Sequence, residues 1–479
     1  MQEGGSYTDC GEERHIDISG NDTIAAISTP YGTGGIGIVR VSGPGAFDIA
    51  ARIFRSRTQF GKIASHTVTH GKIIDPADGR LLDDVLLIKM EAPNTFTAEN
   101  VIEISCHGGI VILKNVLSLV LRQGARAAGP GEFTRRAFIN GKMDLAQAEA
   151  VIDLINSKTD EGSRAAAEQL EGKLSVRISS ARKKLIGLIA HIEAVLEYPE
   201  YDIEELTAEK INDEVKAVKK ELAVIAAGYD RGRLIREGLI AAIVGKPNAG
   251  KSSLMNALSG GDRAIVTDVP GTTRDVIEEY INVNGIPVRL LDTAGIRSTS
   301  DPVEAIGVDR ARKAAADADL VIVVLDARTG ILPEDQDIIR SVGNKKRIVI
   351  INKIDISDDN RIGEMKQQLA TLGEIPVITA SMLDGTGLDE LFEVIAGLFL
   401  KGTIDQNNEV LVTNARHKQL LDTAIKCLGA ADNAHTGGLP LDFVTIDIKE
   451  CADSLGQITG ESVREDVLQE IFSRFCIGK

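Results

Sequence analysis

The pattern of hydrophobic and polar positions changes style along the chain. Up to about residue 120, short β-rich runs such as "IGIVRVSG" and "VLLIKM" stand between turns rich in Gly, Pro and Asp. The stretch 110–124 carries apolar residues at helical spacing and ends at Gly124, which suits a helix C-terminus. We therefore predict an α+β domain over residues 21–140, preceded by a polar, acidic extension, 1–20, that is disordered.

A helical style follows this first segment. Stretches 174–198 and 211–228 place apolar residues mostly three or four positions apart, which is the spacing of amphipathic helices. The same style returns near the C-terminus of the chain. We predict one helical domain assembled from two separate segments, 141–238 and 401–479.

Between these two segments the apolar runs become continuous. "LIAAIVG", "LVIVVLD" and "RIVIIN" are too short for helices and too continuous for a sheet that faces water on one side. They indicate central parallel strands covered on both faces, separated by helices. We predict a doubly wound α/β domain over residues 239–400, inserted into the helical domain, so that the whole chain is multidomain α+β and α/β.

Composition narrows the function classes. The formal net charge is −16, with 4% aromatic residues, which argues against tight unaided RNA binding. The five cysteines are widely spaced, without a CxxC pair, so neither a disulfide framework nor a zinc site is indicated. The N-terminus has no signal-peptide pattern, and no run of 18 apolar residues exists. We expect a cytoplasmic protein without a membrane span.

The inserted domain opens with a phosphate-binding motif. "GKPNAGKS", from Gly245 to Ser252, follows an apolar strand and precedes a helix, as in G-x-x-x-x-G-K-[ST]. The glycines let backbone N–H groups surround a β-phosphate, and the helix adds its positive N-terminal end. Lys251 is expected to reach the β- and γ-phosphates, and the Ser252 hydroxyl to bind Mg²⁺.

Three further segments appear in the order that a GTP site requires. "VPGTTRD" supplies Thr273 as a switch threonine, and "LLDTAG" supplies Asp292 and Gly295. "NKID" supplies Asp355, whose carboxylate can accept two hydrogen bonds from guanine, a donor pair that adenine lacks. The candidate GTP-binding residues are Asn248, Ala249, Gly250, Lys251, Ser252, Ser253, Thr267, Asp268, Val269, Pro270, Gly271, Thr272, Thr273, Asp292, Thr293, Ala294, Gly295, Asn352, Lys353, Asp355, Ser381 and Met382.

Ile296 occupies the position where many GTPases carry a water-orienting Gln. Charge between the β- and γ-phosphates must then be neutralised in another way. The Asn248 carbonyl, with backbone carbonyls of 267–272, can hold a monovalent cation, for which K⁺ is the best fit. Glu304 can swing toward the water, with Arg297 nearby. The alternatives are a turn-forming Asn248 and a solvated Glu304.

The chain as a whole resembles the MnmE (TrmE) family of tRNA-modification GTPases. The resemblance rests on "DTIAAISTPYGTGGIGIVRVSG", "PGEFTRRAFINGKMDLAQAEAVIDLI", "KPNAGKSSLMNALSGGDRAIVTDVPGTTRD" and the terminal "EIFSRFCIGK". It covers residues from about 21 to 479.

The resemblance implies that the N-terminal domain dimerises and binds a 5-formyl- or 5,10-methylene-tetrahydrofolate as one-carbon donor. The family positions that contact folate fall on Arg40, Glu103, Lys142 and Lys479. From the sequence alone, each of these is an ordinary surface charge. Cys476 is either a residue near the folate or target base, or a small residue that ends a helix.

The resemblance also implies a K⁺-stimulated GTPase whose two G domains meet across the nucleotides. K⁺ ligands fall on Asn248, Thr267, Val269 and Thr272, and Mg²⁺ ligands on Ser252 and Thr273; Glu304 matches the family carboxylate implicated in hydrolysis. The implied partner is the flavoprotein MnmG (GidA), in a heterotetramer. Together they attach an aminomethyl or carboxymethylaminomethyl group to C5 of the wobble uridine of certain tRNAs, with the tRNA held mainly by MnmG.

Two other readings share the GTP site. One is a GTP-timed ribosome-assembly or scaffold factor without one-carbon chemistry, although no KH-type RNA module is visible after residue 400. The other is a folate enzyme with a regulatory GTPase. Folate retention by the N-terminal domain and wobble-uridine modification separate the three.

Overall fold

The computed structural model describes residues 22–197, 208–260, 264–265, 279–292, 316–343, 345–400 and 410–479. The chain forms two compact units: unit 1 comprises Met1–Met143 and Asp466–Lys479, and unit 2 comprises Asp144–Glu465.

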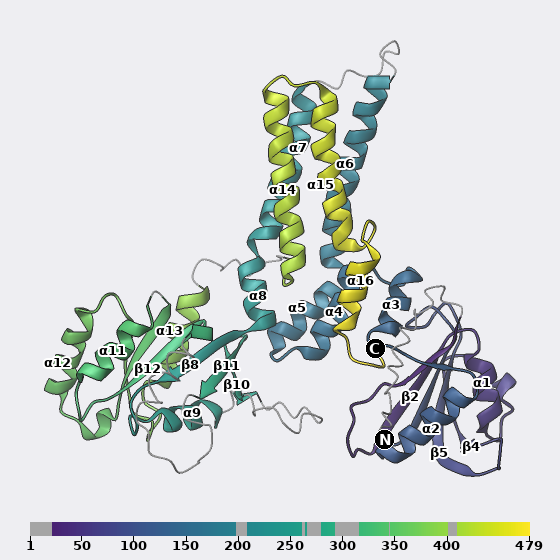
Figure 1. Cartoon of the computed structure of the whole chain (residues 1–479), viewed down its shortest axis with the longest axis horizontal. Coiled ribbons are helices and arrows are strands. Elements are labelled where there is room, and N and C mark those ends of the chain that lie inside the picture. Colours follow the sequence, from purple (N-terminus) through teal and green to yellow (C-terminus); the bar gives the residue numbers. More distant parts are fainter. Residues whose placement is uncertain are drawn as a thin grey trace, which may run out of the picture. The chain divides into compact units, whose positions relative to one another are not determined.

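Unit 1 is built on a seven-stranded sheet with the strand order β3-β4-β5-β6-β2-β1-β7. Figure 1 labels β2, β4 and β5 of this sheet. All neighbours pair antiparallel except β1 and β7, which are parallel. The strands are β1 Ile24–Ile27, β2 Ile36–Ser42, β3 Phe54–Arg55, β4 Thr67–Ile74, β5 Leu81–Met90, β6 Val101–His107 and β7 Arg126–Ala127.

Two helices cover one face of this sheet, because alternate strand residues point into a shared core. Helix α1 (Ala46–Ile53) and helix α2 (Ile110–Arg122) contribute residues such as Ile53 and Leu119 to it, and both side chains are fully buried. On the opposite face, helix α3 (Glu132–Ile139) brings Phe133 into a smaller cluster. The predicted α+β class of this part of the chain is confirmed.

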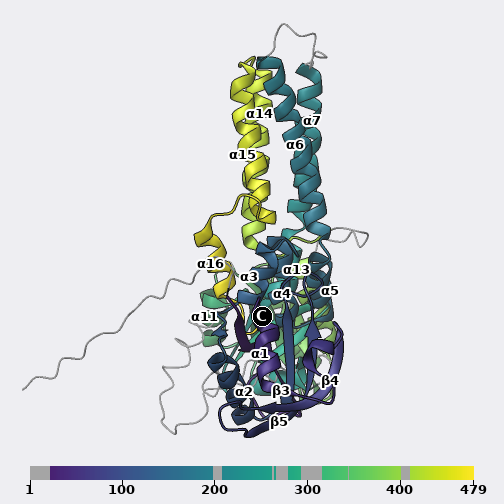
Figure 2. The ribbon, with the colours of Figure 1, turned by 90° about the vertical axis from the view of Figure 1, so that its right-hand side faces the viewer.

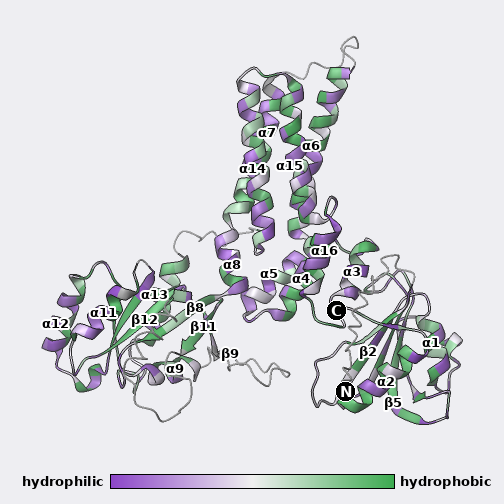
Figure 3. Cartoon of the chain, in the orientation of Figure 1, coloured by the Kyte–Doolittle hydropathy of each residue, from purple (hydrophilic) through white to green (hydrophobic). Residues whose placement is uncertain are grey.

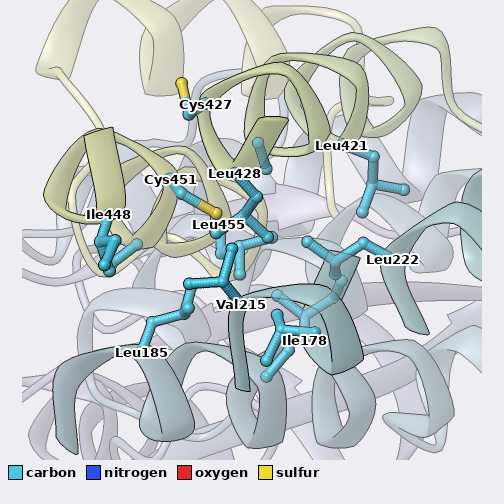
Figure 4. Packing of buried hydrophobic residues seen from close by; sticks show 14 of the residues in the cluster. Ile178, Leu185, Val215, Leu222, Leu421, Cys427, Leu428, Ile448, Cys451 and Leu455 are labelled. Atoms are coloured by element: carbon cyan, nitrogen blue, oxygen red, sulfur yellow. The ribbon is translucent and has the colours of Figure 1, made fainter. Parts of the chain in front are cut away.

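The helical part of unit 2 takes its elements from both sides of the nucleotide-domain segment. Helices α6, α7, α14 and α15 run side by side (Figures 1 and 2). One continuous core joins apolar residues from 146–226 to residues from 412–458, including those in Figure 4. The helices are α4 Leu145–Asn156, α5 Asp160–Leu170, α6 Lys173–Glu197, α7 Ala208–Ala227, α8 Tyr229–Glu237, α14 Ala415–Thr436 and α15 Leu441–Thr459.

The rest of unit 2 is a second seven-stranded sheet, ordered β14-β13-β12-β8-β11-β10-β9. Five neighbouring strands, β14 to β11, are parallel, whereas β10 pairs antiparallel with both β11 and β9. The strands are β8 Leu239–Val244, β9 Ala264–Ile265, β10 Glu279–Val283, β11 Ile286–Asp292, β12 Leu320–Asp326, β13 Lys346–Asn352 and β14 Val377–Ala380.

The central strands of this sheet are apolar along their length because both faces are covered, and they are mostly green in Figure 3. Separate hydrophobic clusters lie on the two faces. The described helices beside the sheet are α9 Lys251–Ser259, α11 Pro333–Ser341, α12 Asp359–Ala370 and α13 Leu388–Leu400, with a 3₁₀ turn at Ile354–Ile356. The predicted doubly wound class is confirmed.

An antiparallel hairpin extends the parallel sheet at the β11 edge. Asn284 and Gly285, with φ of 50° and 88°, form its two-residue turn. Two consecutive positive φ values match a type I′ turn, which suits the twist of the flanking strands. The apolar-run analysis did not predict this hairpin.

The C-terminal segment packs with unit 1. Helix α16 spans Glu465–Ser473, and an antiparallel bridge joins Ile477 to Pro130. The sequence analysis grouped this segment with the helical domain, whereas the contacts place 466–479 in unit 1. Within the described ranges, no helix combines the length and apolar character needed to cross a membrane.

Candidate functional site

The phosphate-binding loop lies between β8 and α9, at the carboxyl edge of the parallel sheet. Gly245 and Gly250 have φ of 148° and 106°, and neither has room for a side chain. A Cβ at Gly245 would lie 2.4 Å from the Val324 oxygen, and one at Gly250 would lie 2.0 Å from Asn352 Nδ2. This cradle therefore requires glycine at both ends, as a loop that presents backbone N–H groups to phosphate does.

Lys251 folds back over the same loop. Its Nζ donates to the carbonyl oxygens of Gly245 at 2.8 Å and Lys246 at 2.7 Å. The ammonium is thus held above the loop that the motif assigns to phosphates. Ser252 and Ser253 follow in the first turn of α9 and are exposed. The Ser252 hydroxyl is thus accessible to a metal ion, as the predicted Mg²⁺ role requires.

The residues predicted to contact the base converge on this loop from β13 and β14. Asn352 is 2% exposed, and its Nδ2 donates to the Ala249 oxygen at 2.9 Å. The backbone N–H of Met382 donates to Asn352 Oδ1 at 3.3 Å. One buried amide therefore joins the phosphate loop to the loop that contains Ser381.

Lys353 adds a second connection between these segments. Its Nζ donates to the Asn248 oxygen at 2.6 Å and to Asp326 Oδ2 at 2.7 Å. Burial raises the pKa of Asp326, but hydrogen bonds from Arg328 and Lys353 outweigh it and hold the pKa well below its ordinary value. The Asp326 carboxylate therefore stays charged and anchors Lys353. Asp355 lies exposed in the 3₁₀ turn that follows.

Asp292 ends β11 and pairs in register with Ile243 of β8, two residues before the phosphate loop begins. Its backbone therefore lies at the same sheet edge. The remaining predicted GTP, K⁺ and catalytic residues of this site lie outside the described residues: Thr267, Asp268, Val269, Pro270, Gly271, Thr272, Thr273, Thr293, Ala294, Gly295, Arg297 and Glu304.

A second polar cluster lies in unit 1. Arg40 on β2 faces Glu103 on β6, with Nε and Oε1 2.8 Å apart, and both side chains are largely buried. Arg40 Nη1 also donates to the Gly478 oxygen at 3.1 Å, which brings the C-terminus to the sheet. Burial and the Arg40 guanidinium lower the pKa of Lys479, the neighbour of Gly478. Three of the four predicted folate residues are therefore in one place.

The fourth, Lys142, is exposed on the turn after α3. Among the described residues, no hydrogen bond or ion pair joins its side chain to the other three. The exposed Cys476 is a neighbour of the cluster through its backbone oxygen, which accepts from the N–H groups of Gly131 and Lys479, both at 3.4 Å.

Sequence reasoning missed the aromatic walls of this cluster. The Arg40 guanidinium lies 5.9 Å from the ring centre of Phe96 and 5.6 Å from that of Phe133. A cation against two aromatic faces is held in a fixed position. No local motif reveals the contact, because Phe96 and Phe133 meet Arg40 only in the folded unit.

His107, the last residue of β6, has a partner that the sequence pattern does not reveal. Its Nδ1 lies 2.6 Å from Oδ1 of Asp83, and its backbone N–H donates to Asp83 Oδ2 at 2.8 Å. The carboxylate is buried and the imidazole is mostly exposed. The 24-residue separation explains why the local pattern gave no signal.

A glycine-rich phosphate loop, a lysine folded over it and an Asn-Lys-x-Asp segment on the neighbouring strand define a P-loop guanine-nucleotide-binding protein. Comparisons with known proteins narrow this class. The model described as "MnmE helical domain" matches residues 145–476, and that described as "GTP-binding protein TrmE N-terminus" matches residues 23–142.

Two relatives of the same name match this chain over nearly its full length. The tRNA modification GTPase MnmE of Acetivibrio thermocellus is 57% identical over 458 residues, covering 96% of this chain and 99% of that protein. The protein of the same name from Enterococcus faecalis is 47% identical, covering 96% and 98%. A crystal structure of Aquifex aeolicus Era bound to GDP and aluminium fluoride shares 29% identity over 40% of this chain and 66% of that one, with a TM-score of 0.28. The chain belongs to the MnmE family of tRNA modification GTPases, which hydrolyse GTP in tRNA modification.

Proposed function

We propose that the chain is a Mg²⁺-dependent, K⁺-stimulated GTP hydrolase. With the flavoprotein MnmG, it adds an aminomethyl or carboxymethylaminomethyl group to C5 of the wobble uridine of certain tRNAs. A 5-formyl- or 5,10-methylene-tetrahydrofolate supplies the carbon. The chain acts in the cytoplasm as a homodimer within a heterotetramer, and MnmG holds most of the tRNA.

The single observation that carries this proposal is the meeting of Arg40, Glu103 and Lys479 in unit 1. A pterin offers amide-like edges to a carboxylate, and a glutamate tail offers carboxylates to Arg and Lys. The two alternative GTPase classes share the nucleotide site. A scaffold or ribosome-assembly factor has no need of such a cluster beside its own C-terminus.

The nucleotide roles follow from the cradle geometry and the motif order. In this proposal Ser252 and Thr273 hold Mg²⁺, with Asp292 nearby, and Asp355 selects guanine. Asn248, Thr267, Val269 and Thr272 hold K⁺, which supplies positive charge between the β- and γ-phosphates. Glu304 and Arg297 orient the attacking water, and Cys476 lies near the one-carbon donor.

The proposal also assigns domains. Residues 21–140 form the folate-binding and dimerisation domain, 239–400 form the G domain, and 141–238 with 401–479 form the helical domain, whose last residues, 466–479, pack with unit 1. The extension, 1–20, has no assigned role.

A reconstituted reaction tests the proposed function. The full chain, MnmG and unmodified tRNA are incubated with GTP, Mg²⁺, K⁺, 5,10-methylene-tetrahydrofolate and an amine (ammonium or glycine) that supplies the nitrogen of the product, and the nucleosides are analysed by mass spectrometry. We expect a C5-modified wobble uridine only when GTP, K⁺ and the folate are all present. GTP turnover without any modified uridine would favour the scaffold alternative, and modification without folate would contradict the one-carbon assignment.

A further inference from the structure

Helix α4 carries two carboxylates, Glu149 and Asp153, that lie one helical turn apart. Residues four positions apart share one helix face. Both side chains are largely buried, and an arginine from a different part of unit 2 binds each of them. The helix therefore joins two distant parts of the chain through one face.

Glu149 binds the start of α14. The Nε and Nη2 atoms of Arg416 donate to its two oxygens at 3.1 Å and 2.7 Å. Two more side chains complete this shell, Asn414 through Nδ2 at 3.0 Å and His417 through Nε2 at 2.7 Å. The carboxylate is thus fully engaged.

Arg416 extends this connection to the last turn of α15. Its Nη1 donates to the Gln457 oxygen at 2.7 Å, and its Nη2 donates to the Ile458 oxygen at 3.3 Å. One guanidinium therefore joins α4 to the C-terminal end of α15.

The chain passes between the two units next to the start of α4 and a few residues after the end of α15. It enters unit 2 at Asp144, directly before α4, and leaves after Glu465, six residues beyond the end of α15 at Thr459. The two points where the backbone connects unit 2 to unit 1 therefore lie close to α4 and to the end of α15, the two helices that Glu149 and Arg416 join.

Asp153 binds the element that leads to the nucleotide site. Arg236 Nε of α8 donates to Asp153 Oδ1 at 2.8 Å. Helix α8 ends at Glu237, and β8 begins two residues later and runs to the phosphate loop. Gly238 between them has φ of 79°, and a Cβ there would lie 2.2 Å from the Pro287 oxygen. A shift of α8 is therefore passed to β8 and to the start of β11.

A second contact joins the same region to β11. Thr159, which caps α5, donates its hydroxyl to the Gly285 oxygen at 2.8 Å. A Cβ at Gly285 would lie 2.6 Å from Glu161 Cγ, so the hairpin turn fits closely against α5. Strand β11 starts beside this turn and ends at Asp292, in the segment assigned to the γ-phosphate.

The Asp153–Arg236 pair has room to rearrange. A cavity of about 300 Å³ lies beside it, with Ser157 and Thr413 in its wall. Asp153 Oδ2 accepts no hydrogen bond from the described residues, whereas both oxygens of Glu149 are engaged. The two carboxylates thus differ: Glu149 is fixed, and Asp153 can change partners.

We propose that Glu149 and Asp153 are positioning residues through which helix α4 couples the state of the nucleotide to the two chain links into unit 1. For tRNA modification this rests on the proposed function above. Asp153 transmits movement of α8 and β11 to α4, and Glu149 passes it through Arg416 to the end of α15. If Glu149 and Asp153 only stabilised unit 2, the backbone at these two links would not respond to the bound nucleotide.

Two substitutions test the coupling from opposite sides. Asp153→Asn keeps the size of the side chain, and Arg236→Met keeps the apolar stem; each removes the charge pair. Neither residue belongs to the nucleotide or folate site. Lys184→Met is the control, because it removes an exposed ion pair with Glu221 elsewhere on the bundle.

The first readout is hydrogen exchange of the backbone amides of 457–465 in the full chain. It compares GDP with GDP plus aluminium fluoride in K⁺. We expect the transition-state mimic to change exchange in wild type and in the control by at least about fivefold, and the change to fall below about twofold in both test variants. The double variant should lose no more than either single variant, because both remove one interaction.

The second readout compares GTP turnover with wobble-uridine modification. We expect turnover in the test variants within about twofold of wild type and modification at least about tenfold slower. The coupling would be overturned if Asp153→Asn kept the wild-type difference in exchange between the two nucleotide states. It would also be overturned if exchange in wild type were the same in both states. Wild type that fails to modify tRNA would contradict the proposed function instead, and the exchange experiment would still decide the coupling.

Discussion

The amide nitrogen of Asn352 occupies the space that a side chain at Gly250 would need. Asn352 Nδ2 lies 2.0 Å from the position of a Cβ at Gly250, and it donates to the oxygen of the preceding residue, Ala249. Strand β13, which ends at Asn352, and the phosphate loop therefore fit together only because residue 250 is glycine.

Gly250→Ala should impair nucleotide binding. The new methyl group would displace Asn352, and φ of 106° is strained for alanine. A cost of about 1–3 kcal/mol corresponds to a loss in nucleotide affinity of roughly fivefold to more than a hundredfold. Titration with a fluorescent GDP analogue measures this. Gly363→Ala is the control, because a Cβ there meets open space, and its affinity should match wild type.

Asp355→Asn should change base specificity rather than abolish binding. In the proposed site the Asp355 carboxylate accepts from two guanine donors, whereas an asparagine amide can donate to the extra oxygen of xanthine. We expect GTP affinity to fall by at least about tenfold, or ~1.4 kcal/mol, and XTP to bind better than GTP. Competition binding with the two nucleotides measures the ratio. A preference for GTP that survives the substitution would show that another group reads the base; Asp359→Asn serves as the control.

Glu149→Gln should destabilise unit 2 in a pH-dependent way. Burial raises the pKa of Glu149, but His417 and Arg416 outweigh it and lower the pKa from 4.5 to about 2. The charged form therefore adds stability that is complete above the unfolded pKa of 4.5 and is lost as pH falls toward 2. The variant should lose roughly 3 kcal/mol at pH 7, and its difference from wild type should shrink below about pH 4.5.

Urea unfolding at pH 7 and pH 3 measures this difference. Glu221→Gln, in an exposed ion pair, is the control and should change stability by less than about 1 kcal/mol. An equal loss at both pH values would argue against a charged Glu149.

Arg40→Met should weaken folate binding while leaving GTP turnover unchanged. The substitution keeps a long apolar side chain between Phe96 and Phe133 but removes the contacts to Glu103 and to the C-terminus. We expect the affinity for 5-formyl-tetrahydrofolate to fall about tenfold to a hundredfold, or ~1.4–3 kcal/mol, in calorimetry. Arg52→Met, at an exposed position of α1 in the same unit, should bind folate like wild type.

Local signals made much of the fold predictable from the sequence. Strands β8, β12 and β13 are continuous apolar runs because both their faces are buried, and the helices of the bundle show clear periodicity. The Asn284-Gly285 dipeptide is a local signal for the β10–β11 hairpin, because both residues tolerate the positive φ of a type I′ turn, but it does not show in the pattern of apolar runs.

Other features depend on long-range packing. Arg40 meets Glu103 only through strand register, and Glu149 meets Arg416 across 267 residues. The Ser462 hydroxyl donates to the backbone oxygen of Asp453 in α15, a contact across nine residues that joins the segment before α16 to that helix.

The central claim is that a potassium ion replaces the missing glutamine. Asn248 has φ of 63°, so Asn248→Gly removes the side-chain oxygen without straining the backbone. Asn284→Gly, at φ of 50° in the hairpin turn, is the matched control.

GTP turnover of the full chain in KCl and in NaCl, at equal ionic strength, tests this claim most directly. We expect wild type and Asn284→Gly to turn over at least about tenfold faster in K⁺, equivalent to a barrier lowered by ~1.4 kcal/mol, and Asn248→Gly to lose this difference. Equal rates for wild type in the two salts would contradict it.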